Sequence, residues 1–111
     1  MKVYLDDIRP TPDGWHRTYN VQETINILEK YQVVELSLDY DLGEDLETME
    51  QLAKGKEVLV YILDRLKKTH DVNFVPSLIH LHTGNIIGKR EMEFLLADII
   101  KIMMEIGYEH T

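Results

Sequence analysis

Apolar and polar residues follow one another along the chain in blocks whose lengths predict strands and helices in turn. Short apolar runs bounded by turn residues are typical of buried strands, and apolar residues three or four positions apart are typical of helices that pack on one side. These patterns predict strands at 2–5, 15–19, 33–38 and 77–82. They predict helices after the N-cap residue Asn20, at 55–68, and at 89–106 with Gly107 as the C-cap.

Strands and helices that alternate in this way favour an α/β fold, with a mostly parallel sheet and helices on both faces. The chain has 111 residues, enough for one domain with its own core. It contains no internal repeat, low-complexity segment or linker, so residues 1–111 are expected to form that single domain. Ligands of such sheets bind beyond the carboxyl ends of the strands, and we expect the functional site there.

Charge and composition exclude several functional classes. A formal net charge of −8 argues against binding along an extended nucleic-acid duplex, although one terminal phosphate can still be held. The absence of cysteine excludes disulfides and thiolate zinc sites. No apolar run is long enough to cross a membrane, and the opening residues MKVYLDDIRP do not resemble a signal peptide. The sequence therefore indicates a cytoplasmic protein without a membrane partner.

Acidic residues directly follow two of the predicted strands. Asp6 and Asp7 follow the strand at 2–5, and Asp39 follows the strand at 33–38. If these strands are neighbours, the three carboxylates lie close together, and their repulsion favours protonation or a bound cation. Mg²⁺ or Mn²⁺ suits such a site, because hard cations prefer carboxylate oxygens and keep water ligands that a phosphate can replace. The alternative is that these acids only solvate loops or cap helices.

A turn rich in hydrogen-bonding groups follows the last predicted strand. Thr83, Gly84 and Asn85 offer a hydroxyl, an amide and backbone N–H groups near the start of a helix, which suits phosphate oxygens. Arg9 follows the acid pair and is the cation that we expect to neutralise a phosphate. Both features also have a structural explanation, because the turn can simply cap the helix and the arginine can form a surface ion pair.

Further side chains near the predicted edge are candidates for catalysis or substrate contact. Asp41 and His82 are the candidates for moving a proton or orienting water. Trp15 can stack on a base, although a tryptophan at the start of a strand more often belongs to the core. His80 shares a strand face with His82 and is expected to be an interior histidine.

Four short blocks of the sequence carry a resemblance to a known family. They are DDIRP (6–10), DGW (13–15), LDYDLG (38–43) and HTGN (82–85), the last followed by Gly88. Together they resemble the cyclic-phosphate-processing receiver-like domains, which are related to the receiver domains of response regulators. The resemblance implies a reduced, flavodoxin-like three-layer sandwich with a four-stranded sheet. It also implies a magnesium ion held by Asp6, Asp7 and Asp39, and action on terminal or 2′,3′-cyclic phosphates in RNA repair.

The chain departs from the resembled pattern at several positions. Tyr40 stands where the family usually has histidine, Ile86 replaces a proline, and Thr83 replaces a serine of the same hydroxyl chemistry. Relative to the receivers of response regulators, a loop at 8–14 replaces the first helix, and no fifth strand with the usual lysine is visible. The missing lysine argues against signalling through a phosphorylated aspartate.

These observations lead to one preferred function and two alternatives. The preferred function is metal-dependent processing of a terminal or 2′,3′-cyclic phosphate on a nucleotide or RNA end, with Asp39, Asp41 and His82 at the catalytic positions. The first alternative is a non-catalytic module that binds a nucleotide or phosphate in the same pocket. The second is a phosphoacceptor signalling domain in which Asp39 is phosphorylated.

The last predicted helix carries more apolar residues than one packed face needs. They are Met92, Phe94, Leu95, Leu96, Ile99, Ile100, Ile102, Met103, Met104 and Ile106. Because the strand at 77–82 is also expected at a sheet edge, the excess predicts a homodimer through this helix. The competing interpretation is that the helix lies across the sheet edge and is buried on two sides.

Overall fold

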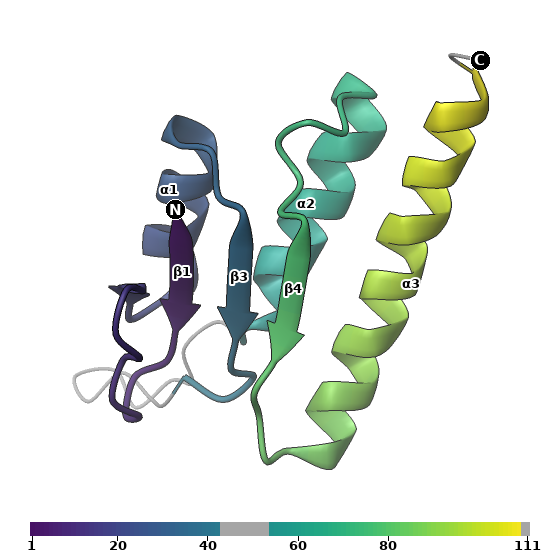
Figure 1. Ribbon diagram of the computed structural model, residues 1–111. Coiled ribbons are helices and arrows are strands. Elements are labelled where there is room, and N and C mark those ends of the chain that lie inside the picture. The colour runs from purple at the N-terminus through teal and green to yellow at the C-terminus, as the bar shows by residue number, and fades with distance from the viewer. Residues whose placement is uncertain (43–53, 110–111) are drawn as a thin grey trace.

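The described part of the chain forms one parallel sheet with three helices. A computed structural model describes residues 1–42 and 54–109, apart from the side chains of residues 108 and 109. The strands lie in the order β2-β1-β3-β4, and every neighbouring pair is parallel. In chain order the elements are β1 (Lys2–Leu5), β2 (His16–Thr18), α1 (Val21–Lys30), β3 (Glu35–Leu38), α2 (Lys56–Thr69), β4 (Leu78–Leu81) and α3 (Ile86–Glu109). All of them except β2 are labelled in Figure 1.

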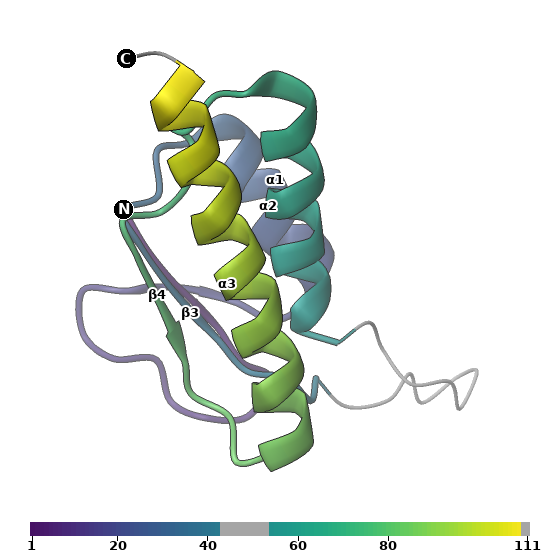
Figure 2. The same cartoon turned by 90° about the vertical axis from the view of Figure 1, so that its right-hand side faces the viewer.

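One face of the sheet carries the hydrophobic core. The register aligns alternate residues of β1, β3 and β4 in rows, and alternate residues of a strand point to the same face. The core-facing rows are Val3, Leu36 and Ile79, then Leu5, Leu38 and Leu81. Helices α1 and α2 both lie on this side of the sheet (Figures 1 and 2).

The opposite face is covered differently from what the sequence predicts. Its central row is Tyr4, Ser37 and His80. No helix lies over it within the described residues; the loop between β1 and β2 curves past it instead (Figure 2). Trp15 of that loop packs edge-to-face against Tyr4, with ring centroids 6.2 Å apart. The predicted second helical layer is replaced by a loop because the segment after β1 contains Pro10 and further helix-breaking residues.

Helix α3 stands beyond β4 at the end of the sheet and packs against α2 (Figure 1). Its most buried positions, Met92, Ile99 and Ile106, recur every seven residues and make the packed side. The helix begins at Ile86 rather than near residue 89, and it continues through Gly107, which the sequence predicts as its C-cap.

The topology confirms the predicted α/β, flavodoxin-like class and places β4 at a sheet edge. β2, whose direction the sequence leaves open, runs parallel to β1. Most of the acid-rich segment at 41–53 lies outside the described residues. None of the helices within the described ranges has the combined length and apolar character of a membrane-spanning helix.

Candidate functional site

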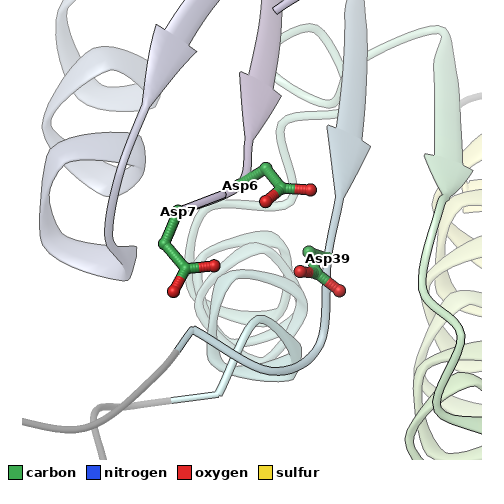
Figure 3. Close-up of side chains that lie close together, drawn as sticks. All are labelled: Asp6, Asp7 and Asp39. Atoms are coloured by element: carbon green, nitrogen blue, oxygen red, sulfur yellow. The ribbon is translucent and has the colours of Figure 1, made fainter. Parts of the chain in front are cut away.

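Three aspartates meet at the carboxyl ends of two neighbouring strands. Asp6 and Asp7 follow β1, and Asp39 follows β3 (Figure 3). Because β1 and β3 pair directly, with Leu5 opposite Leu38, the residues that follow them are brought side by side. One carboxylate oxygen from each aspartate lies within 4.8 Å of those of the other two. The clustering that the sequence predicts is therefore present, and we call these residues the acid triad.

Asp6 is the buried member of the triad and is held on all sides. Its side chain is 1% exposed, Oδ1 accepts hydrogen bonds from the backbone N–H groups of Ile8 (2.8 Å) and Arg9 (3.0 Å), and Oδ2 lies 3.0 Å from His82 Nε2. Burial acts to raise the pKa of Asp6, but these hydrogen bonds outweigh it and hold the pKa below its ordinary value. Asp6 therefore stays ionised and anchors the loop that follows β1.

Asp39 and Asp7 are more open than Asp6 and have no ion-pair partner within the described residues. Burial, reinforced by the negative charge of Asp6, raises the pKa of Asp39, although hydrogen bonds from the Tyr40 backbone and the Thr83 hydroxyl act in the opposite direction. No lysine or arginine forms an ion pair with Asp7 or Asp39 among the residues that the structure describes. A cation beside these carboxylates would balance their charge and would counteract the rise in the pKa of Asp39.

The triad lines one side of an open pocket whose other side is the turn after β4. The cavity measures about 670 Å³ and is lined by the acid triad, Ile8, Arg9, Asp41 and residues 83–85. Thus all three predicted metal ligands, all four predicted phosphate-binding residues and two of the three predicted catalytic residues, Asp39 and Asp41, line a single cavity. His82 and Trp15 are not among its lining residues.

The turn side of the pocket is tied together by its own hydrogen bonds. The side-chain Nδ2 of Asn85 donates to Asp41 Oδ2 (3.0 Å), and Lys54 Nζ donates to Asp41 Oδ1 (3.2 Å). The hydrogen bond from Asn85, assisted by Lys54, lowers the pKa of Asp41, which is therefore an ionised structural link. Asn85 Oδ1 also accepts from the backbone N–H of Gly88 (2.9 Å) and caps α3, which explains why that helix begins at Ile86.

Arg9 reaches across the pocket from the β1 loop to the end of β4. Its guanidinium donates to the backbone carbonyl of His82, and Nη1 lies 3.9 Å from Asp6 Oδ2. The side chain is 46% exposed, so several of its N–H groups still face solvent. These groups are available to an anion that enters the pocket.

His82 supports the site from behind rather than facing the pocket. Its ring stacks on Tyr4 with centroids 4.3 Å apart, Nδ1 lies 2.6 Å from Ser37 Oγ, and Nε2 lies 3.0 Å from Asp6 Oδ2. Burial lowers the pKa of His82, and the hydrogen bond and negative charge of Asp6 only partly offset this. Both ring nitrogens have protein partners, so His82 is placed to orient Asp6. Sequence reasoning missed Ser37 and Tyr4, whose shared face with His82 becomes visible only once the strand register is known.

Two further predictions about the sheet face need revision. His80, predicted to be interior, has a side chain that is 50% exposed and pairs with Glu35 at 3.2 Å, because no helix lies over that face within the described residues. Trp15, predicted to stack on a substrate base, packs on Tyr4 and lies 5.7 Å from Lys2 Nζ, outside the pocket lining. Its position favours the structural interpretation.

Residues 1–98 match the family described as the cyclic-phosphate processing receiver domain. The chain belongs to this family. A search of curated proteins and a search of solved structures each found no match. The matched range includes every residue that lines the pocket, together with the first half of α3.

Tyr40 of this cyclic-phosphate processing receiver domain makes a structural contact between the segment after β3 and α3. Its ring is buried, and its hydroxyl donates to Glu91 Oε2 (2.9 Å), away from the pocket lining. A Cβ atom at Gly88 would lie only 2.3 Å from the Tyr40 ring, so glycine is required for α3 to approach this closely. Tyr40 therefore links the segment after β3 to α3.

Proposed function

We propose that the protein is a cytoplasmic enzyme that uses Mg²⁺ or Mn²⁺ to process a terminal or 2′,3′-cyclic phosphate on a nucleotide or RNA end. One observation carries the proposal: the acid triad and the predicted anion-binding groups, Arg9 and residues 83–85, line the same cavity. Membership of the cyclic-phosphate processing receiver family supports the choice of a cyclic phosphate as substrate.

The donor set of the triad fits a hard divalent cation. All three side chains are carboxylates, no histidine or cysteine belongs to the cluster, and the pocket is open enough for water ligands to remain. When bound, such a cation would neutralise phosphate charge and lower the pKa of a bound water. Asp7 and Asp39 would hold it most directly, since the oxygens of Asp6 already accept hydrogen bonds from the protein.

The remaining pocket groups suit the phosphate itself. Arg9 carries the positive charge that a non-bridging phosphate oxygen would meet, and the turn at 83–85 lies at the N-terminal end of α3. Hydrolysis of a cyclic phosphate joins a water oxygen to phosphorus and breaks the bond from phosphorus to O2′ or O3′. The proton lost by the attacking water is balanced by the proton that the leaving oxygen gains, so no further reactant is needed.

A second candidate function, the non-catalytic binding module, is favoured by a separate observation. Asp41 and His82, the two predicted proton carriers, are both engaged by partners within the protein. In this interpretation the same groups capture a phosphate or nucleotide without converting it.

One assay separates these functions. The protein is incubated with Mg²⁺ and the four nucleoside 2′,3′-cyclic phosphates, products are followed by chromatography, and binding is followed by calorimetry. We expect turnover that Asp39→Asn abolishes and that Glu29→Gln, an exposed acid on α1, leaves unchanged. Saturable binding without turnover supports the module, and a covalent mass gain with acetyl phosphate supports the phosphoacceptor. If the protein neither binds nor converts any of these nucleotides, the proposal is overturned.

A further inference from the structure

Helix α3 exposes an apolar stripe beside its packed side. Met92, Ile99 and Ile106 face the core, whereas Ile100 and Met104 are 56% and 62% exposed. These two residues lie one helical turn apart, so their side chains are neighbours on the helix surface. With the partly buried Leu96 and Met103 they form a continuous stripe along the C-terminal half of α3, which we call the α3 stripe.

The described part of the chain leaves this stripe uncovered. A groove separates it from the sheet edge, with Val75 and Ile79 on the sheet side and Leu96, Ile100 and Met103 on the helix side. Strand β4 pairs only with β3 among the described strands, and Leu78 at its start is 52% exposed. A second depression, lined by α3 residues alone, shares Ile100 and Met104 with the groove. The apolar surface therefore continues from the free sheet edge around to the outer side of the helix.

Two opposite charges flank the stripe. Lys101 and Glu105 line the second depression together with Ile100 and Met104. Within residues 1–42 and 54–109 neither charge forms an ion pair or another polar contact. Both are therefore available to a partner.

The apolar residues of the α3 stripe and its two flanking charges match those of a second copy in one orientation. When two identical helices cross antiparallel near residues 102–103, Ile100 of each meets Met104 of the other. The same crossing places Lys101 of each opposite Glu105 of the other, so both kinds of contact form together. A parallel twofold pair would instead place Lys101 and Glu105 of one copy on the opposite side of the interface from those of the other, so it would not form these ion pairs. Because the chain carries a net charge of −8, two copies repel each other elsewhere, which makes a locally balanced surface necessary for association.

We propose that the α3 stripe docks a second copy of this chain, with the two α3 helices antiparallel around a twofold axis near residues 102–103. The side chains of one copy cover the groove and the second depression of the other. This interface uses only the apolar residues and charges of α3 and is independent of the phosphate site.

Dimerisation is tested by light scattering and sedimentation over a concentration series, with circular dichroism to check that each variant folds. We expect a wild-type dimer, and Met104→Glu should weaken it at least about 100-fold, because it places two carboxylates in the apolar centre. The matched control is Tyr19→Glu, a 54% exposed aromatic residue next to β2 at the other end of the sheet, which should leave the dissociation constant unchanged.

A charge exchange tests the orientation. Lys101→Glu and Glu105→Lys should each weaken the dimer about tenfold, because each creates two repulsive contacts across the axis. The double variant Lys101→Glu/Glu105→Lys restores both contacts and should return to within about threefold of wild type. A wild-type monomer at about 100 μM, a weakened dimer in the Tyr19 control, or a double variant as weak as the singles would overturn the proposal.

Discussion

The two sides of the pocket use their polar groups in different ways. On the turn side, Asn85 hydrogen-bonds to Asp41 and caps α3, so its polar groups are satisfied within the protein. On the acid side, Asp7 and Asp39 have no cationic partner among the described residues, and burial and the charge of Asp6 raise the pKa of Asp39. Satisfied groups give the pocket its shape, whereas uncompensated charge determines which ligand it prefers.

The largest expected effect separates the two kinds of acid within the triad. Asp6→Ala removes a buried carboxylate that accepts two backbone hydrogen bonds and contacts His82, so it should lower the free energy of unfolding by about 2–4 kcal/mol. Asp7→Ala, which breaks no hydrogen bond or ion pair within the described residues, should change it by less than about 0.5 kcal/mol. Chemical denaturation measures both. Equal losses would mean that the triad is structural throughout.

The next largest loss of stability is expected on the turn side, where Asn85 caps α3. Asn85→Ala removes the N-cap of α3 and should cost about 1 kcal/mol of stability even without a ligand. Asn85→Ser, whose hydroxyl can still cap the helix, should recover most of that loss. Thermal melts of the two variants in metal-free buffer provide the measurement, and an Asn85→Ala variant as stable as wild type would contradict the account.

A smaller effect on the free energy of unfolding is expected at Asp39, where a substitution should stabilise the protein rather than destabilise it. The raised pKa means that the folded protein disfavours the ionised form, so this residue costs stability as the pH rises through that pKa. In metal-free buffer Asp39→Asn should therefore stabilise the protein by about 0.5–1 kcal/mol at pH 7. The gain should disappear below the unfolded pKa of about 3.9. Melting curves between pH 3 and 8 test this, and a variant less stable than wild type at pH 7 would show that Asp39 is a favourable structural contact.

Much of the fold and part of the site could be predicted from the sequence, for different reasons. The spacing of hydrophobic residues and the positions of turn residues were enough to locate the helices and strands. The adjacency of Asp6 and Asp39 follows from the rule that parallel strands end at one edge of the sheet. The role of His82 could not be predicted, because its partners Ser37 and Asp6 lie 45 and 76 residues away and depend on strand register. The exposure of His80 was missed because it depends on what covers a sheet face, which strand periodicity does not reveal.

The central claim, a divalent-metal site at the acid triad, is tested most directly by titrating the protein with Mn²⁺ and measuring bound ion by electron paramagnetic resonance. We predict one ion per chain, an affinity at least about tenfold weaker in Asp39→Asn, and an unchanged affinity in the control Glu29→Gln. Bound metal should also stabilise the folded state by about 2.7 kcal/mol when its concentration reaches about 100 times the dissociation constant. Absence of saturable binding, or equal binding by Asp39→Asn and wild type, would contradict the account.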